Sequence, residues 1–357
     1  MVGLEMNLFF WKDRRVLLTG HTGFKGSWLS LWLQHLGAEV FGYSLAPLDD
    51  QNLFTLADVA KGITSEFGDV RDLSSLNRTI QKVQPEIVIH MAAQALVRYG
   101  YHNPVETYST NVMGTVNLFE AVRQCKSVRA VVSVTSDKCY ENMEWEWGYR
   151  ENEPLGGHDP YSSSKAAAEL VTSAYRSSYL KNNHVAVASA RAGNVIGGGD
   201  WAKDRLVPDV IQAYTHGKPA KIRNPEAIRP WQHVLEPLSG YLTLAENLYL
   251  SPEEFSGAWN FGPNDMDAKP VRWVVNQLAK AWGIDPAWQD DELPQLHEAH
   301  YLKLDISKAR LQLGWEPKWT LDKALELTGQ WYRGYSGGIG PRKMSIDQIE
   351  HYQESIR

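Results

Sequence analysis

Short apolar runs alternate with segments of helical periodicity through the first two-thirds of the chain. A strand followed by a helix, repeated several times, predicts an α/β fold with a Rossmann-like, doubly wound parallel sheet. The predicted strands are Val16–Thr19, Glu39–Leu45, Ile63–Asp69, Glu86–Ala93, Arg129–Thr135 and Val185–Ala190. One helix is predicted after Gly26 and others over Leu73–Val83, Val105–Gln124 and Tyr161–Leu180. The first of these helices should bury one face, formed by Trp28, Leu29, Trp32, Leu33 and Leu36, and end at Gly37.

The pattern changes after about residue 197, where loops rich in glycine and proline separate helical segments and a Trp-rich helical tail follows. We therefore expect residues 1–196 to form the sheet domain and residues 197–357 a smaller, mostly helical lobe, with some chain crossing back. Ligands of open α/β sheets bind at the carboxyl ends of the strands, so the smaller lobe should lie over that edge.

Composition narrows the class of partner. The 357 residues carry a formal net charge of −6, which leaves no basic face for nucleic acid. The two cysteines, Cys125 and Cys139, are expected to be reduced thiols in an intracellular protein. The apolar run at residues 8–11 is too short for the core of a signal peptide, and no long apolar span follows. We expect a cytoplasmic protein without a membrane anchor.

Three glycines, Gly20, Gly23 and Gly26, follow the first predicted strand and open the first predicted helix. A glycine-rich turn in this context cradles a dinucleotide diphosphate against the helix N-terminus. The predicted cofactor-binding residues of this turn are Gly20, Thr22, Gly23, Phe24, Lys25 and Gly26.

The rest of the predicted cofactor path follows the ends of later strands. An acidic residue that would hold the ribose 2′-hydroxyl is missing at the end of the second strand, where Ser44 stands, and no arginine lies beside it to hold a 2′-phosphate. We favour NAD over NADP. Asp69 and Val70 are candidates for contacts to the adenine, and Ala92 and Ala93 for the path from diphosphate to ribose.

Tyr161 and Lys165 lie one helical turn apart on one face of a predicted helix. A tyrosine has a reference pKa near 10, so a tyrosinate base at neutral pH needs about 4 kcal/mol of stabilisation. Lys165 and the positive nicotinamide of an oxidised cofactor can supply it. Tyr161 and Lys165 are also expected to contact the cofactor. Together with the glycine turn, this pair predicts an enzyme that moves a hydride and a proton.

Ser136, Asp137 and Lys138 follow the fifth strand, where nicotinamide and substrate should meet. A hydroxyl, a carboxyl and an amine are more than simple hydride transfer requires. A carboxylic acid can protonate a leaving hydroxyl, and a neutral amine can remove a carbon-bound proton beside a ketone.

These stretches resemble the extended short-chain dehydrogenases/reductases, and specifically the nucleotide-sugar 4,6-dehydratases. The matching stretches are Thr-Gly-His-Thr-Gly-Phe-Lys-Gly at 19–26, His-Met-Ala-Ala-Gln at 90–94, residues 108–115, Thr-Ser-Asp-Lys-Cys-Tyr at 135–140, residues 191–201 and Arg-Pro-Trp-Gln-His-Val at 229–234. The resemblance spans nearly the whole chain and is closest to the branch that acts on CDP-D-glucose. It implies a lyase that forms the 4-keto-6-deoxy sugar and water with regenerated NAD, feeding deoxyhexose synthesis of the O-antigen type.

The resemblance gives Asp137 the role of general acid. Related dehydratases that act on dTDP-glucose carry Thr-Asp-Glu where this chain has Ser136-Asp137-Lys138. The change from glutamate to Lys138 leaves the carbon-5 base open, because an ammonium must lose its proton before it can act. Lys138 is either that base or a group that stabilises an enolate.

A nucleotide diphosphate needs fixed cations, and arginine suits phosphate oxygens. The substrate-binding candidates are Gln94, Arg191, Asn194, Arg205, Arg229, His233 and Tyr301. By resemblance Asn194 contacts the diphosphosugar and Arg229 a phosphate. No metal site is predicted, because His233, His297 and His300 have no ligand spacing with other donors.

Two other functions share part of this machinery. A nucleotide-sugar 4-epimerase would use the cofactor and Tyr161 but has no role for Asp137 and Lys138. A non-catalytic NAD-sensing regulator of the same fold would not need the Tyr161–Lys165 pair. The helices over Val105–Gln124 and Tyr161–Leu180 resemble a dimer face of the family, so we expect a homo-oligomer, a dimer or a dimer of dimers.

Overall fold

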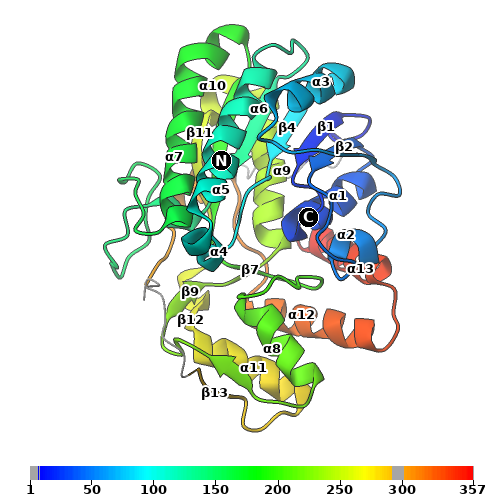
Figure 1. Ribbon diagram of the computed structural model, residues 1–357, viewed down its shortest axis with the longest axis vertical. Coiled ribbons are helices and arrows are strands. Elements are labelled where there is room, and N and C mark those ends of the chain that lie inside the picture. The colour runs from blue at the N-terminus through cyan, green and yellow to red at the C-terminus, as the bar shows by residue number, and fades with distance from the viewer. Residues whose placement is uncertain (1–6, 8, 292–300, 357) are drawn as a thin grey trace.

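A seven-stranded, all-parallel sheet organises the protein (Figure 1). The computed structural model describes residue 7, residues 9–291 and residues 301–356. The strand order across the sheet is β11-β6-β5-β4-β1-β2-β3. The strands are β1 (Arg15–Thr19), β2 (Glu39–Ser44), β3 (Thr64–Phe67), β4 (Ile87–His90), β5 (Ala130–Val134), β6 (Ala186–Ala192) and β11 (Gly257–Phe261). The predicted α/β class and all six predicted strands are confirmed.

Helices cover both faces of the sheet (Figure 1). One face is covered by α1 (Phe24–His35) and α9 (Leu235–Leu250), and α13 (Pro341–Ser355) packs on α1. The other is covered by α3 (Leu73–Val83), α6 (Gly114–Val122) and α7 (Pro160–Tyr175). The predicted bounds of α3 are those observed. The predicted helix Val105–Gln124 is α5 (Pro104–Tyr108), a π-helical turn (Ser109–Met113) and α6, and a second π-helical turn (Arg176–Leu180) extends α7.

The first helix is buried more completely than its predicted single face. All eight residues from Gly26 to Leu33 are buried, because α1 is enclosed by the sheet, α9 and α13. Trp32, for example, packs edge-on against Tyr352 of α13 with ring centroids 5.6 Å apart. The C-terminal helix therefore completes the packing of the glycine-turn helix.

The seventh strand, β11, was not predicted. It pairs with β6 at the sheet edge, with Asn260 opposite Arg191. Residues beyond 197 thus return to the central sheet, through α9 and β11. The predicted boundary between two domains at residue 196 stays a prediction. Short helices also connect the sheet elements: α2 (Leu53–Leu56), α4 (Val97–His102), α10 (Pro252–Phe255) and the 3-10 turns η2 (Asp137–Cys139) and η4 (Lys181–Asn183).

A smaller lobe lies below the sheet in Figure 1. Three helices build most of it: α8 (Leu206–Thr215), α11 (Val271–Trp282) and α12 (Leu321–Ser336). Its short strand pairs are β7 (Val195–Ile196) with β10 (Gln232–His233), β9 (Ile228–Pro230) with β12 (Ala268–Pro270), and β8 (Ala220–Ile222) with β13 (Trp288–Asp290). The 3-10 turn η5 (Asp265–Asp267) and a π-helical turn (Ala309–Leu313) complete the described elements.

The order in which strands are added to the sheet reverses between β1 and β4: β2 and β3 follow outward on one side of β1, and β4 begins the other half of the sheet. Ligands of doubly wound sheets bind at such a switch point, beyond the carboxyl ends of the strands. Within the described part of the chain, no helix has the length and apolar character needed to span a membrane.

Candidate active site

The turn between β1 and α1 requires glycine at two positions. Gly20 has a φ of +78°, and a Cβ there would lie 2.7 Å from the backbone nitrogen of Ala92. A Cβ on Gly26 would lie 2.0 Å from the carbonyl oxygen of Gly20. These glycines let β1, β4 and α1 approach one another closely, as the sequence analysis expected.

Gly23 has a different role, because it faces open space. A Cβ there would meet only the Gly20 carbonyl, at 3.4 Å. Gly23 is also the N-cap of α1, which has no capping side chain and no acidic residue in its first turn. The free N–H groups and the positive end of the helix dipole are suited to hold a phosphate.

A cavity of about 1240 Å³ opens over this turn and the adjoining strand ends. It exceeds the 300–1,000 Å³ of typical small-molecule sites, so it has room for two large ligands. Every predicted cofactor-binding residue lines it: Gly20, Thr22, Gly23, Phe24, Lys25, Gly26, Ser44, Asp69, Val70, Ala92, Ala93, Tyr161 and Lys165. So do the predicted catalytic residues Ser136, Asp137 and Lys138.

Hydroxyl groups stand at the end of β2, where the ribose of a dinucleotide is expected. The Thr22 and Ser44 side-chain oxygens lie 2.8 Å apart, and Thr22 also donates to the Leu45 carbonyl at 3.0 Å. Asp69 is held by the Arg71 guanidinium at 2.6 Å, which lowers the pKa of the Asp69 carboxyl. This end of the cavity can offer hydroxyls to a ribose.

Tyr161 and Lys165 come from the first turns of α7. Asp159 caps this helix by accepting a hydrogen bond from the Ser162 N–H at 3.0 Å. Burial raises the pKa of Tyr161 to about 12, and a hydrogen bond with Ser136 opposes that shift. Burial lowers the pKa of Lys165 to about 8, against the charge of Glu169. In the free protein, therefore, Tyr161 is a neutral phenol.

Asp137 is the most enclosed acid of the site, with 2% of its surface exposed. It opens η2, directly after β5, and its Oδ1 accepts a hydrogen bond from the Ser136 hydroxyl at 2.9 Å. Its buried Oδ2 has no hydrogen-bond partner among the described residues. Burial raises the pKa of Asp137, and the nearby Lys138 and Ser136 only partly offset this. A carboxyl group in this state can donate a proton.

Three predicted substrate anchors also line the cavity, on the side of the smaller lobe: Asn194, Arg205 and Arg229. Arg205, at the N-cap of α8, forms an ion pair with Asp200 at 2.9 Å. Arg229 lies on β9 and donates to the neighbouring Ile228 carbonyl at 2.9 Å. The cavity thus joins the glycine turn, the Tyr161–Asp137 region and two arginines.

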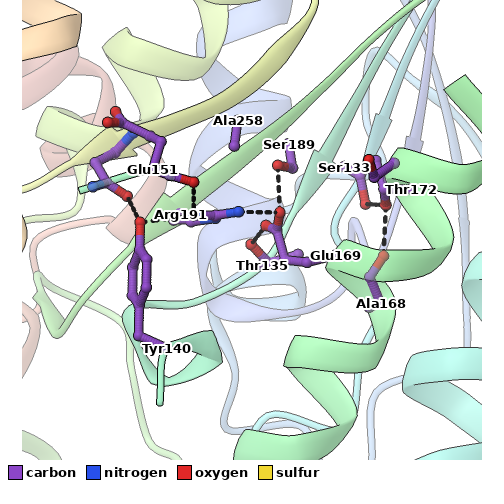
Figure 2. A network of polar contacts seen from close by, with 12 residues as sticks. Ser133, Thr135, Tyr140, Glu151, Ala168, Glu169, Thr172, Ser189, Arg191 and Ala258 are labelled. Carbon is purple, nitrogen blue, oxygen red and sulfur yellow. Dashed lines mark hydrogen bonds and ion pairs between the residues drawn. The ribbon is translucent and has the colours of Figure 1, made fainter. Parts of the chain in front are cut away.

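Arg191 does not reach this cavity. Figure 2 shows its guanidinium directed to Glu169 of α7, at 2.7 Å, and to the Tyr140 hydroxyl, also at 2.7 Å. The hydroxyls of Thr135 and Ser189 donate to the same carboxylate. With its charge already paired in the interior, Arg191 has a structural position rather than that of a phosphate anchor.

Three other substrate candidates also lie off the cavity wall. Gln94 is bound to Leu96 and Thr107 by its side-chain amide. His233 is buried, accepts from the Leu235 N–H and packs against two tryptophans. Tyr301 contacts Lys303, whose ammonium lies 5.1 Å from its ring centroid. His297 and His300 lie outside the described residues, and within those no group of three or more His, Cys, Asp or Glu side chains is arranged to hold a metal.

The cavity wall also contains residues that sequence reasoning did not select. Arg98 and Arg223 line it and both approach Asp204, at 3.2 and 3.6 Å. Asp200, which forms the ion pair with Arg205, also lines the cavity and was not predicted. An acid five residues before a predicted anchor could have indicated the Asp200 pair, whereas Arg98 stands in no motif and only the fold brings it to the cavity.

Family comparison agrees with this arrangement. The family model described as GDP-mannose 4,6 dehydratase matches residues 17–328, and the chain belongs to this family. Within it, the chain is 54% identical to the CDP-glucose 4,6-dehydratase of Salmonella typhimurium, over 97% of this chain and 98% of the relative. The predicted resemblance to nucleotide-sugar 4,6-dehydratases is confirmed.

Solved structures show the same fold. The UDP-glucose 4-epimerase of Thermotoga maritima, solved with UDP-glucose, superposes with a TM-score of 0.78 at 21% identity, over 90% of this chain and 99% of that one. The dTDP-glucose 4,6-dehydratase of Bacillus anthracis, solved with NAD, gives a TM-score of 0.76 at 23% identity, over 91% and 98%.

Proposed function

We propose that this protein is a lyase that converts CDP-D-glucose to CDP-4-keto-6-deoxy-D-glucose and water, with NAD as its cofactor. The 54% identity to a CDP-glucose 4,6-dehydratase over nearly the whole chain supports the substrate. The site observation that carries the proposal is the buried Asp137 carboxyl, with one unpartnered oxygen, on the same cavity as Tyr161 and the glycine turn.

The residues of the cavity fit NAD. The N-terminus of α1 and Gly23 suit its diphosphate, and the Thr22–Ser44 hydroxyls suit a ribose without a 2′-phosphate. Bound NAD supplies the chemistry of accepting a hydride from carbon 4 of the sugar and returning one to carbon 6. The protein's own groups must manage the protons.

Tyr161 removes the proton of the sugar 4-hydroxyl. Its pKa of about 12 in the free protein means that the base form must be stabilised when ligands bind. The charge of Arg205 favours the tyrosinate, and the ammonium of Lys165, one turn along α7, would act in the same direction.

Asp137 and Lys138 then act on carbons 5 and 6. The 4-ketone acidifies the hydrogen on carbon 5. Lys138 is the group proposed to remove it as a proton and to return a proton to carbon 5 when the hydride reaches carbon 6. Asp137, whose pKa burial raises, gives its proton to the departing 6-hydroxyl, which leaves as water. Arg205, Arg229 and Asn194 hold the diphosphate and sugar in position.

A 4-epimerase is the main competing function, and the two reactions differ in what they need. Epimerisation requires no acid at carbon 6, so a buried Asp137 carboxyl with a raised pKa would have no role. A cofactor-sensing regulator would need neither Asp137 nor Tyr161. The arrangement of these two residues on one cavity favours the dehydratase.

The test is to incubate the purified protein and NAD with CDP-, dTDP-, UDP- and GDP-activated sugars and to record mass spectra. Loss of one water from CDP-glucose, with turnover at least tenfold above that of dTDP-glucose, is expected. An unchanged mass with a new sugar would indicate an epimerase. No reaction with any donor, while NAD still binds, would support the regulator.

We also infer that the protein is a homo-oligomer and works in the cytoplasm, where its two buried free thiols stay reduced. Apolar side chains are exposed along α5, the following π-helical turn and α7, as the predicted dimer face requires. They are Val105 (82% exposed), Met113 (51%) and Leu170 (60%). Light scattering of the purified protein would return a monomer mass if this inference is wrong.

A further inference from the structure

A second pocket, of about 490 Å³, is separate from the cavity over the glycine turn. None of the described residues that line it also lines that cavity. Figure 2 shows part of its wall, which includes Glu151, Glu169 of α7, Ser189 and Arg191 of β6, and Ala258 of β11. Its volume falls within the range of about 300–1,000 Å³ that is typical of small-molecule sites. The proposed function gives this pocket no role.

Three basic side chains share the pocket. Arg191 lies on β6, Arg176 begins the π-helical turn after α7, and Lys308 directly precedes the π-helical turn Ala309–Leu313. Arg191 is buried, and the other two are half-buried. Burial and the charge of Arg191 lower the pKa of Arg176. Burial and the charges of both arginines lower the pKa of Lys308, against the charge of Glu151. The three cations are therefore close enough to repel one another.

The protein does not use all the hydrogen-bond donors of these side chains. The Nε of Arg191 is buried and has no hydrogen-bond partner among the described residues. The Arg176 guanidinium donates to the Ser173 hydroxyl at 3.1 Å, and the Lys308 ammonium donates to the Ala258 carbonyl at 2.7 Å. Within the described part of the chain, each of these two side chains makes that one hydrogen bond and no ion pair. Because arginine has five N–H donors and lysine three, several remain available.

The acids of the pocket, in contrast, already have partners. Glu169 accepts hydrogen bonds from Arg191 and from two buried hydroxyls. Glu151 accepts a backbone N–H at 2.9 Å, and burial raises the pKa of its carboxyl. Glu153 accepts another backbone N–H at 3.1 Å. Unused donors beside engaged acids suit a ligand that is rich in acceptors and negatively charged.

We propose that this pocket binds a small phosphate ester, whose phosphoryl group is held by Arg176 and Lys308 with the buried charge of Arg191 behind them. A phosphoryl group presents three acceptor oxygens and so suits two cations that come from separate elements. A carboxylate has two oxygens, which a single arginine fork satisfies. The pocket is larger than free phosphate needs, and the organic part of the ester fills the rest, beside Asn152 and Leu155. The inference does not depend on the proposed function.

Isothermal titration calorimetry of the full-length protein, in its native assembly, tests the class of ligand. The three probes are glucose 1-phosphate, inorganic phosphate and acetate. Glucose 1-phosphate should bind about tenfold more tightly than inorganic phosphate, because the sugar adds contacts, and acetate about tenfold more weakly than inorganic phosphate. Equal affinity for inorganic phosphate and the ester would overturn the assignment to an ester. Equal affinity for acetate would overturn the assignment to a phosphoryl group.

Two variants locate the bound phosphate. Arg176→Gln and Lys308→Met should each weaken the binding of glucose 1-phosphate by about tenfold or more, because each removes a charged donor. Arg78→Gln on α3 and Lys181→Met after α7 remove exposed cations outside the pocket. These matched controls should bind the ester as the parent does. Thermal unfolding verifies that each variant is folded.

The large cavity also contains arginines that suit a phosphate, so a further variant separates the two sites. Arg229→Gln alters the cavity and leaves the second pocket intact, so it should keep the affinity of the parent for glucose 1-phosphate. Hydrogen–deuterium exchange gives an independent location. The bound ester should slow exchange at residues 151–155 and 173–176 and leave residues 20–26 unchanged.

The outcomes separate this inference from the proposed function. Loss of binding in Arg229→Gln, with normal binding in Arg176→Gln and Lys308→Met, would place the phosphate in the large cavity and overturn the inference. Binding that survives both pocket variants, or the absence of binding to the parent, would overturn it as well. None of these measurements depends on NAD or on turnover. A protein that binds the ester in this pocket but converts no nucleotide sugar would defeat the proposed function alone.

Discussion

The carboxylate of Glu169 and the guanidinium of Arg191 form an ion pair at 2.7 Å, with side-chain exposures of only 3% and 4% (Figure 2). Glu169 stands one helical turn after Lys165 on α7, and Arg191 belongs to β6. The pair therefore fixes the helix that carries Tyr161 and Lys165 against the central sheet.

Removing one partner of this pair should destabilise the protein without acting on the substrate directly. We expect Arg191→Met to lower the free energy of unfolding by about 3–5 kcal/mol, because it leaves the Glu169 charge buried and unpaired. Thermal or urea unfolding checks this, with Arg78→Met on the exposed side of α3 as control. A raised KM with unchanged stability would instead return Arg191 to the role of substrate anchor.

Tyr161→Phe should lower turnover by about 10²–10⁴-fold, because the proton of the sugar hydroxyl loses its acceptor. Dinucleotide affinity should change little, since the glycine turn is untouched. Turnover by mass spectrometry and binding by calorimetry test both statements, with Tyr179→Phe as a half-exposed control on the turn after α7. Turnover within tenfold of the parent would exclude Tyr161 from the mechanism.

Asp137→Asn should still oxidise the sugar but lose water about 10²–10⁴-fold more slowly, because the amide cannot supply the proton. Reduced dinucleotide should then accumulate, which near-ultraviolet absorbance detects. Exchange of the carbon-5 hydrogen with deuterium from solvent should remain. An inactive variant with no reduced dinucleotide would place Asp137 in the oxidation step.

Lys138→Met should also form reduced dinucleotide but lose the carbon-5 exchange, if Lys138 is the base. Mass spectrometry of sugars recovered from deuterated water measures the exchange. Normal exchange in this variant would show that the base is another group, and Lys138 would then stabilise charge in the site.

Glu246→Gln tests a titration that affects stability rather than catalysis. Burial raises the pKa of Glu246 from 4.5 to about 7, against a hydrogen bond from the Asn7 N–H at 3.2 Å. The folded state holds the proton more tightly, so this contribution to stability is complete below pH 4.5 and is lost as the pH rises through about 7.

The variant should melt with the parent at pH 4.5 to 5 and a few degrees above it at pH 8, because glutamine is never charged. Scanning calorimetry at the two pH values makes the comparison. Glu236, whose pKa burial also raises to about 7, is present in both proteins, so its titration cancels. A constant difference across the pH range would contradict the prediction.

Local pattern was sufficient for much of the fold. The bounds of α3 and the glycine turn follow from periodicity and from a close approach that only Gly20 and Gly26 permit. β11 was missed because a five-residue strand after a long helical region has no periodic signal, and its partner β6 lies far back in the sequence. Non-local pairing of this kind is not visible in one segment.

The candidate site was likewise predictable where local sequence decides, and not where distant segments pair. Residues on strand ends and in the two helical motifs reach one cavity, because the topology of a parallel sheet carries them there. Arg191 was predicted to line the cavity from its motif alone, but it lies off the cavity wall; an arginine inside an apolar strand is as consistent with a buried partner as with a phosphate. The partner, Glu169, stands four positions after Lys165, but nothing in either segment pairs them.

The late return of β11 to the sheet constrains how the protein can be made. Until the ribosome has released residues 257–261, the outer edge of β6 offers unpaired N–H and C=O groups to any neighbouring strand. By then β7, α8, β8, β9, β10 and α9 have already been synthesised. The central sheet therefore cannot be completed until part of the smaller lobe has been synthesised, and nascent chains truncated near residue 200 should depend on chaperones to avoid aggregation.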